Sequence, residues 1–151
     1  GRVHAIGAGN VIFEIQQNSD TTYRVFDWNR VGLDGKPREL HLPQSLASID
    51  FNDFAPALES RPSVRRGDAT VRSVADCPLF AVEQMNLAAG KSTPLSGGTM
   101  HILGVVSGEL SVSGAGAAVR LTAGEFCLVP ACVSSVINAT SAASFLRAEA
   151  K

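Results

Sequence analysis

Two early segments of the chain alternate hydrophobic and polar residues, and a polar stretch separates them. Both segments lie within residues 11–28, VIFEIQQNSDTTYRVFDW, and the polar stretch covers residues 16–20. This pattern predicts two β-strands joined by a turn, because strand side chains point alternately to opposite faces. Arg24 falls in the middle of the second strand, where burial is costly unless a negative group meets the guanidinium. Glu14 on the first strand supplies a carboxylate, and His4 precedes both strands, so the predicted sheet brings an acid, a cation and an imidazole together.

The residues that follow predict loops and a little helix. Residues 29–38 contain Asp-Gly and Pro turn signals, and residues 39–42 are expected to form a short strand. Residues 43–50 begin with proline and space their apolar residues three apart, which predicts one or two helical turns. Residues 51–68 contain two prolines and an Arg-Arg-Gly run, so the domain boundary is expected there.

The second half of the chain repeats short apolar segments at regular intervals, with glycine-containing turns between them. The expected strands are 70–74, 79–87, 100–106, 109–113, 118–122, 126–129, 134–137 and 144–148. Many short strands with almost no helix predict an all-β fold, a small antiparallel barrel or sandwich. Phe126, Leu128 and Phe145 are expected to lie in its core. The two predicted domains cover residues 1–60 and 69–151.

Composition and charge narrow the function classes. The chain has 151 residues, of which 45% are hydrophobic and 18% charged, as in globular proteins. Its net charge of −1 provides no general attraction to nucleic acid or to an anionic membrane, and no apolar run approaches the length of a membrane span. Cys77, Cys127 and Cys132 are an odd number without CxxC spacing. They are therefore expected to be small buried thiols in the reducing cytoplasm rather than members of a disulfide.

The first residues carry a separate signal. The chain opens without methionine, and its first four residues, Gly-Arg-Val-His, resemble the interior of a motif. We therefore expect the polypeptide to be a piece of a longer protein.

Residues 97–130 resemble a cupin. The resemblance rests on the Val-x-Ser-Gly-Glu-Leu hairpin at 105–110 and on the Gly-Glu-Phe-Cys-Leu-Val-Pro run at 124–130. Cupins are β-barrels that commonly hold a divalent metal on two histidines and a glutamate of one hairpin and a third histidine of a later one. Those positions are changed in this chain, so the resemblance implies a cupin-like barrel without the metal. The residues near them are Leu95, Ser96, Gly97, His101 and Ser135.

The first third of the chain resembles the C-terminal part of the type I mannose-6-phosphate isomerases, which are zinc-dependent cupin enzymes. The match runs through residues 1–30 and the Arg-Glu-Leu-His-Leu stretch at 38–42. Within that family the matching histidine, here His4, is a zinc ligand, and the matching arginine, Arg24, is the proposed active-site arginine. Glu14 occupies the place of a glutamate in the sugar pocket. The other zinc ligands of the family come from earlier strands.

The resemblance implies an all-β protein of the cupin β-barrel or jelly-roll type, with an incomplete first barrel followed by a small second cupin-like barrel. It implies a zinc-dependent enzyme that converts mannose 6-phosphate to fructose 6-phosphate, and thus a sugar phosphate as the ligand. No nucleic acid or membrane partner is expected. Because the other zinc ligands lie outside this chain, the chain alone is expected to be inactive.

Two further hypotheses remain. The chain is either a catalytically silent cupin remnant that acts as a binding or structural module, or a sugar-binding cupin without zinc. In the first case, exposed strand edges favour a homodimer. A salt bridge to Glu14 or Asp27 also explains Arg24, and holding Arg24 in place also explains Glu14. His41 and His101 are expected to be structural or surface residues.

Overall fold

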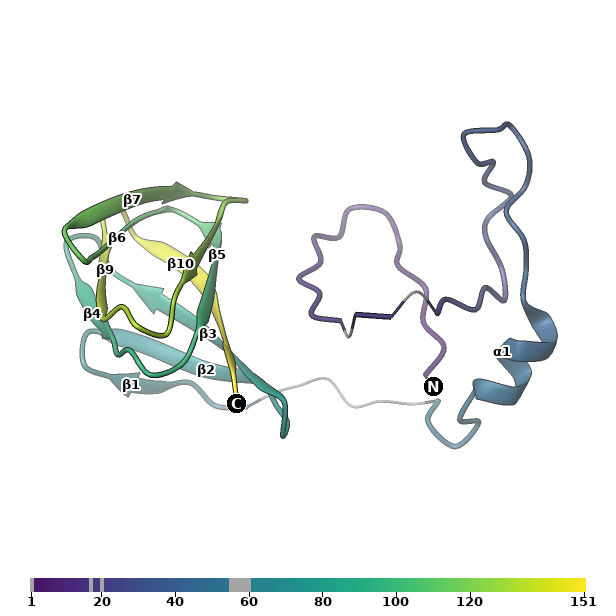
Figure 1. Cartoon of the computed structure of the whole chain (residues 1–151), viewed down its shortest axis with the longest axis horizontal. Coiled ribbons are helices and arrows are strands. Elements are labelled where there is room, and N and C mark those ends of the chain that lie inside the picture. The colour runs from purple at the N-terminus through teal and green to yellow at the C-terminus, as the bar shows by residue number, and fades with distance from the viewer. Residues whose placement is uncertain (1, 17, 20, 55–60) are drawn as a thin grey trace. The chain divides into compact units, whose positions relative to one another are not determined.

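The chain divides into two compact units, residues 1–58 and 59–151. A computed structural model (Figure 1) describes residues 2–16, 18–19, 21–54 and 61–151. Gln17 and Asp20 of the expected turn and residues 55–60 of the expected boundary lie outside the described residues.

The described residues of the first unit contain one short helix and no strand. Helix α1 (Leu42–Ser48) carries a proline in its first turn, where a missing N–H costs no hydrogen bond, and His41 is its N-cap residue. The helical turns expected over residues 43–50 are confirmed. The strand expected over residues 39–42 is wrong. Residues 39–41 form no strand, and residue 42 already belongs to the helix. No helix among the described residues has the length and hydrophobicity to cross a membrane.

The hairpin expected over residues 11–28 is wrong for the described part of that segment, which contains no strand. Large apolar side chains in it, such as Val11, Ile12 and Phe26, are exposed. A strand must place its backbone N–H and C=O groups on a neighbour, and a lone hairpin is at best marginally stable in water. The described residues of the first unit include no other strand and no buried large apolar side chain. Alternation alone therefore does not produce a sheet here.

The described residues of the second unit form ten strands in two antiparallel sheets, which enclose a barrel-like core (Figure 1). The strands are β1 (Val64–Arg66), β2 (Ala69–Asp76), β3 (Phe80–Leu87), β4 (Ser92–Leu95), β5 (His101–Ser107), β6 (Glu109–Gly114), β7 (Ala117–Thr122), β8 (Phe126–Val129), β9 (Ser135–Ala139) and β10 (Ala143–Ala150). One sheet has the order β1-β2-β3-β10-β5-β8, and the other has the order β4-β9-β6-β7. All eight strands expected from the pattern are confirmed.

The two strands that the pattern missed, β1 and β4, both lie at sheet edges. Strand β1 has three residues, two of them arginines, so it shows no apolar alternation. Strand β4 contains Pro94, which is tolerated at an edge because an edge strand needs partners on one side only. Short, charged or proline-containing edges also discourage pairing with other chains.

The core lies between the two sheets and draws on both. Phe145 of β10 and Leu103 of β5 come from one sheet, and Leu110 of β6 and Ile137 of β9 come from the other, all fully buried. The prediction for Phe145 is confirmed. The prediction for Phe126 and Leu128 is wrong, since 60% and 56% of their surfaces are exposed.

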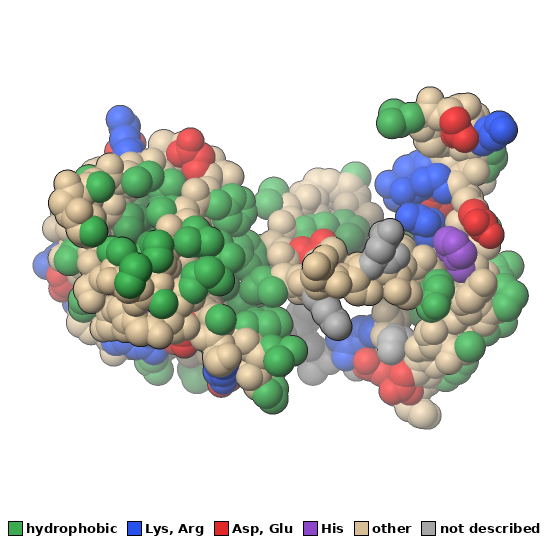
Figure 2. Space-filling model, viewed as in Figure 1, with side chains coloured by type: hydrophobic (Ala, Val, Ile, Leu, Met, Phe, Trp, Pro, Cys, Tyr) green, Lys and Arg blue, Asp and Glu red, His purple; other side chains and the backbone are tan. Residues whose placement is uncertain are grey.

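The geometry of strand β8 explains that error. Side chains alternate along a strand, and on β8 the other two residues, Cys127 and Val129, pack on the core. Phe126 and Leu128 therefore face outward. Figure 2 shows hydrophobic side chains on the surface of the second unit, whose large exposed residues also include Val106.

The three cysteines are free, as expected. Their expected burial is only partly correct. Cys77 and Cys127 are half-buried, and Cys132 is exposed. Burial raises the pKa of the Cys127 thiol, which makes this residue a poor nucleophile at neutral pH.

Candidate functional site

Asp27 is the centre of a charged cluster in the first unit. Its side chain is 9% exposed. Nε of Arg38 donates a hydrogen bond of 2.6 Å to its Oδ2, and Nη2 of Arg38 donates to its Oδ1. Nε of Arg30 lies 3.7 Å from Oδ1. The hydrogen bond from Arg38 holds the pKa of Asp27 below its usual range, although burial opposes this, so the carboxylate is ionised at neutral pH.

The backbone turns sharply at this cluster. The N–H of Arg30 donates to the carbonyl of Asp27 over 3.0 Å, and the two residues between them, Trp28 and Asn29, have φ angles of +53° and +55°. Left-handed backbone is uncommon outside glycine and is strained for a residue as large as tryptophan. The ion pairs of Asp27 hold this turn closed.

Arg24 is fastened to helix α1 through His41. The N–H of Arg24 donates to Nδ1 of His41 over 3.3 Å, and the N–H of His41 donates to the carbonyl of Arg24 over 2.8 Å. The ring of Tyr23 lies 6.1 Å from that of His41 between centroids. His41 therefore has a structural contact with the segment that carries the predicted active-site arginine.

Arg24 is half-buried, and its charge helps to lower the pKa of Asp27. Among the described residues, Arg24 forms no ion pair within 4 Å with Asp27 or with Glu14. Its charge is thus close to an acidic group that Arg38 already neutralises.

The other two predicted site residues are exposed. His4 and Glu14 both lie on the surface of the first unit, and no hydrogen bond or ion pair in the described part of the chain joins either of them to Arg24. Their convergence with Arg24 on one pocket stays a prediction.

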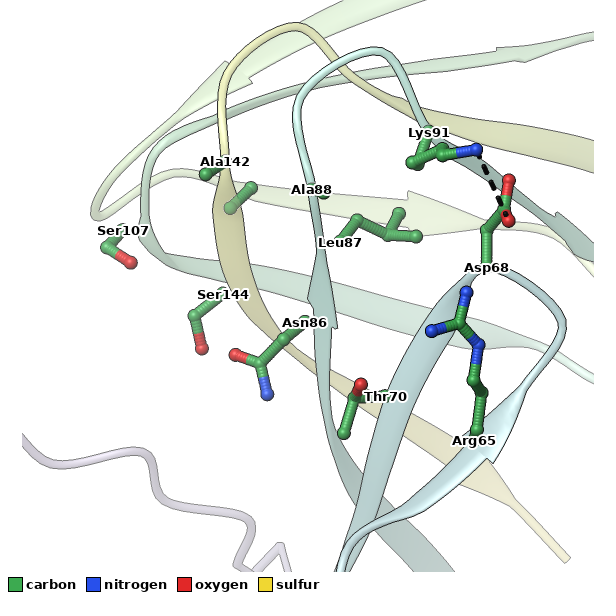
Figure 3. A pocket seen from close by; sticks show the side chains of 11 residues that line it. Arg65, Asp68, Thr70, Asn86, Leu87, Ala88, Lys91, Ser107, Ala142 and Ser144 are labelled. Carbon is green, nitrogen blue, oxygen red and sulfur yellow. Dashed lines mark ion pairs between the residues drawn. The ribbon is translucent and has the colours of Figure 1, made fainter.

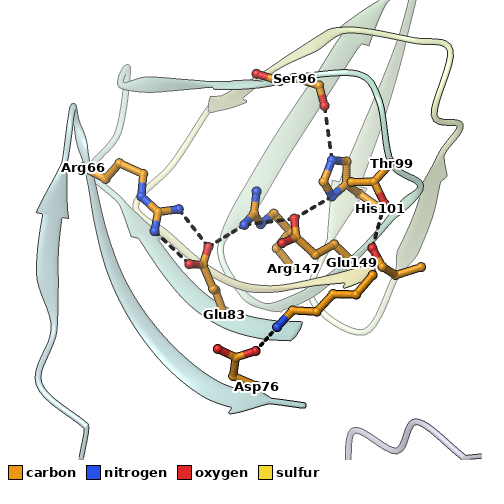
Figure 4. Close-up of polar contacts among 10 residues, drawn as sticks. Arg66, Asp76, Glu83, Ser96, Thr99, His101, Arg147 and Glu149 are labelled. Atoms are coloured by element: carbon orange, nitrogen blue, oxygen red, sulfur yellow. Dashed lines mark hydrogen bonds and ion pairs between the residues drawn. The ribbon is translucent and has the colours of Figure 1, made fainter. Parts of the chain in front are cut away.

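A chain of charged and polar groups runs through the barrel of the second unit, and the sequence reasoning missed it (Figure 4). Arg66 donates to Glu83 from both Nη atoms over 3.0 and 2.8 Å. Nη2 of Arg147 donates to Glu83 over 2.8 Å and lies 3.3 Å from Oε2 of Glu149. Oε2 of Glu149 in turn lies 3.6 Å from Nδ1 of His101.

The register of the strands places these groups together. Arg147 is the partner of Glu83 across β10 and β3, and Glu149 is the partner of His101 across β10 and β5. Phe145, Arg147 and Glu149 share one face of β10, and that face begins in the core. A sequence signal did exist, because charged residues two apart that follow a core phenylalanine on one strand are unusual on a buried face.

The barrel unit also has a hollow lined by residues of several strands and loops (Figure 3). Its volume is about 430 Å³, and Asp68, Thr70, Asn86 and Lys91 contribute polar groups to it. Nζ of Lys91 lies 3.7 Å from Oδ1 of Asp68. Exposed ion pairs of this kind contribute little energy, and the hollow presents no paired nucleophile and base.

The chain is similar to curated mannose-6-phosphate isomerases, although no family model matches it. It is 40% identical over 95 residues to mannose-6-phosphate isomerase ManA of Bacillus subtilis, a match that covers 61% of this chain and 29% of ManA. It is 38% identical over 88 residues to the mannose-6-phosphate isomerase of Streptococcus mutans, covering 58% of this chain and 27% of that protein. The chain thus spans less than a third of the length of these relatives.

Solved structures support the fold. The mannose 6-phosphate isomerase of Bacillus subtilis superimposes with a TM-score of 0.72 at 21% identity, over 87% of this chain and 41% of that chain. KdgF from Halomonas and an RmlC-like cupin from Shewanella frigidimarina each give a TM-score of 0.55 over 60% of this chain. The expected all-β, cupin-type fold is confirmed. The chain is therefore similar to the mannose-6-phosphate isomerases over the part of their length that it spans, as its motifs predicted.

Proposed function

We propose that this chain is part of a mannose-6-phosphate isomerase, an enzyme that converts mannose 6-phosphate to fructose 6-phosphate. The observation that supports this most strongly is the 40% identity with ManA over 95 residues. The chain spans 29% of ManA, so the activity belongs to a longer protein in which this chain supplies some of the site residues.

The reaction moves a proton between C1 and C2 of the sugar through an enediol. It needs a base that works near pH 7 and a positive centre for the developing enediolate oxygen or the phosphate. Arg24 supplies the positive centre in this proposal. The residue is half-buried and has no ion pair within 4 Å to Asp27 or Glu14 in the part of the chain that the structure describes, which suits that role. Glu14 is a candidate proton carrier.

The donor set of the described residues does not fit zinc by itself. Zinc in proteins takes three or four N, S or O donors, and a catalytic site holds three protein ligands. No three His, Cys, Asp or Glu side chains of the described residues lie together as a possible metal site. In the proposal His4 supplies one imidazole, and the remaining ligands come from the part of the relatives that this chain does not span.

The isolated chain tests this division of ligands. The purified 151-residue chain, incubated with zinc and then desalted, is expected to retain far less than one zinc ion per chain by elemental mass spectrometry. It is also expected to show no turnover of mannose 6-phosphate in an assay coupled to fructose 6-phosphate. One zinc ion per chain together with turnover would show that the chain contains a whole active site.

A second candidate function is a catalytically silent cupin remnant that binds a ligand or another chain. The exposure of His4 and Glu14, with no contact to Arg24 in the described residues, favours it. In this case edge strands such as β8 are where a second copy would pair. The two candidates differ in whether Arg24 is needed for isomerisation when the rest of a ManA-like protein is present.

A further inference from the structure

Arg24 and His41 are joined by two hydrogen bonds that run in opposite directions. The N–H of His41 donates to the carbonyl of Arg24 over 2.8 Å, and the N–H of Arg24 donates to Nδ1 of the His41 ring over 3.3 Å. Two residues that face each other on antiparallel strands normally exchange both bonds between backbone groups. Here the imidazole takes the place of the backbone carbonyl of His41.

The carbonyl of His41 is already used by helix α1. It accepts the N–H of Ser45 over 2.8 Å, as the carbonyl of an N-cap residue does when it receives the first hydrogen bond of a helix. A backbone N–H that finds no acceptor is unfavourable, and the ring supplies the acceptor for Arg24. One residue therefore begins the helix and also holds both backbone polar groups of Arg24.

The ion pair of Asp27 with Arg38 is a second link between the same two segments. Asp27 lies three residues after Arg24, and Arg38 lies three residues before His41. The two links therefore fall in one antiparallel register. Together they fix the backbone that carries Arg24, from the helix on one side and from the ion pair on the other.

The side chain of Arg24 depends on this backbone for its position. Within the part of the chain that the structure describes, its guanidinium forms no hydrogen bond and no ion pair within 4 Å. A long side chain that is held only at its backbone end moves whenever that end moves. Precise placement of such a group requires supporting residues that lock its surroundings.

The bond to Arg24 requires one form of the His41 ring. An N–H only donates, so Nδ1 carries a lone pair and the proton of the neutral ring is on Nε2. Nε2 lies 4.0 Å from Oε2 of Glu39, a carboxylate that favours a proton on this nitrogen. The His41 side chain is 20% exposed, and the ring of Tyr23 lies 6.1 Å from it between centroids. The ring is thus held in place with its acceptor towards Arg24.

We propose that His41 is the positioning residue of Arg24. In its Nε2–H form it fixes the backbone of Arg24, so that the guanidinium is held where the sugar phosphate binds. This inference rests on the proposed isomerase function, in which Arg24 supplies the positive centre. His41 touches neither substrate nor metal in this role and acts through Arg24. The effect on rate is large for its size, since a misplacement of about 1 Å can cost roughly 100-fold.

NMR of the ¹⁵N-labelled 151-residue chain tests the positioning itself. The ring of His41 is expected in the Nε2–H form. His41→Leu is expected to speed hydrogen exchange at the amide of Arg24 by about fivefold, the effect of one lost hydrogen bond. The amide of Arg30, which donates to Asp27 in the same unit, is the control and is expected to keep its rate.

His41→Asn is the rescue variant, because its Oδ1 is an acceptor as far along the side chain as Nδ1. It is expected to restore slow exchange at the amide of Arg24. The inference is overturned by a ring in the Nδ1–H form, or by an Arg24 amide that exchanges equally fast in the wild type and in His41→Leu. The form of the wild-type ring decides the point even if His41→Leu does not fold.

A double substitution separates this inference from the proposed function. In a chimera, this chain replaces the matching stretch of Bacillus subtilis ManA. His41→Leu is expected to lower kcat/KM by roughly tenfold or more at unchanged zinc content, and His41→Asn to recover most of the loss. After Arg24→Ala, His41→Leu is expected to lower kcat/KM by less than about twofold, because no guanidinium is left to position.

The outcomes of the chimera experiment are distinguishable. An active chimera that needs Arg24 but keeps its rate after His41→Leu contradicts the positioning role. A loss after His41→Leu that is just as large in the Arg24→Ala background also contradicts it, since His41 then acts on the structure as a whole. An inactive chimera, or one that does not need Arg24, counts against the proposed function, and the NMR of the chain then decides the positioning alone.

Discussion

Arg38 and Asp27 form a two-pronged ion pair that closes the loop between them. Nε of Arg38 donates to Oδ2 of Asp27 over 2.6 Å, and Nη2 donates to Oδ1. The carboxylate is almost completely buried by the surrounding loop. Bidentate pairs of this kind are the stronger and more directional ion pairs. The described part of the first unit thus contains ion pairs, of which this is one, and a short helix, where the sequence pattern predicted a hairpin.

The ion pair predicts how the first unit responds to acid. The pKa of Asp27 is lower in the folded state than the ordinary value of about 3.9. The stabilisation is therefore fully present above about pH 4 and is lost as pH falls through the lower folded-state pKa. A ¹³C-carboxyl NMR titration of Asp27 is expected to show this low midpoint, and Arg38→Gln is expected to move it up towards the ordinary value. A midpoint that Arg38→Gln does not change would contradict the pairing.

Glu83 is predicted to be important for the stability of the barrel. Glu83→Gln leaves the guanidinium groups of Arg66 and Arg147 without their shared carboxylate. We expect it to lower the free energy of unfolding by roughly 2 kcal/mol, since breaking a buried pair is strongly destabilising and Glu83 retains some solvent contact. Urea unfolding gives the midpoint and slope. Arg120→Gln, which breaks an exposed pair, is expected to change the midpoint much less, and equal effects of the two variants would count against a special role for Glu83.

Gly108 allows a sharp test of the barrel's packing. Its φ is +77°, and a Cβ there would lie 2.1 Å from the carbonyl oxygen of Ala142. Gly116 has a similar φ of +79° but has open space around the same position. Gly116→Ala is expected to cost about 1–2 kcal/mol through backbone strain alone. Gly108→Ala is expected to destabilise by at least about 1 kcal/mol more, because backbone must also move. Similar thermal midpoints for the two variants would show that Ala142 is not this close.

Strand β8 predicts weak self-association of the chain. It lies at the edge of the six-stranded sheet and exposes Phe126 and Leu128. Exposed edges with apolar side chains pair readily with other strands. Sedimentation equilibrium is expected to detect a dimer that Leu128→Lys weakens by roughly tenfold or more. A wild-type chain that stays monomeric at high concentration would exclude this interface.

The barrel could be predicted from the sequence because its pattern and its packing agree. Strands such as β5 and β10 alternate, and their inward residues, Leu103 and Phe145, meet in one core. The first segment alternates just as clearly, but the described residues around Val11 and Phe26 offer no strand to pair with and no core to enter. Alternation of hydrophobic and polar residues favours a β-strand. A stable sheet also requires neighbouring strands and a core for the strand to pack on.

The candidate sites, like the fold, could be predicted from the sequence only in part. Motif resemblance predicted Arg24 as a site residue, and that role stays a prediction. The resemblance gave no distances between residues far apart in the chain, such as the contact of Arg24 with His41. The polar chain that ends at His101 was missed because its groups come from β1, β3, β5 and β10, and only the strand register brings Glu149 opposite His101. The interpretation of His101 as a structural residue accounted for its burial and not for its position beside Glu149.

The turnover of a chimeric enzyme tests the proposed function most directly. The chain would replace the matching stretch of Bacillus subtilis ManA, and folding and zinc content would be checked before kinetics. We expect the chimera to isomerise mannose 6-phosphate, and Arg24→Ala to lower kcat/KM by roughly 100-fold or more while zinc content stays unchanged, because the lost charge acts on the transition state. Arg120→Ala, which removes a largely exposed guanidinium of the barrel unit, is expected to stay within about twofold, as surface changes usually do. A folded, zinc-loaded chimera that is inactive, or one that keeps its full rate after Arg24→Ala, would contradict the proposed function.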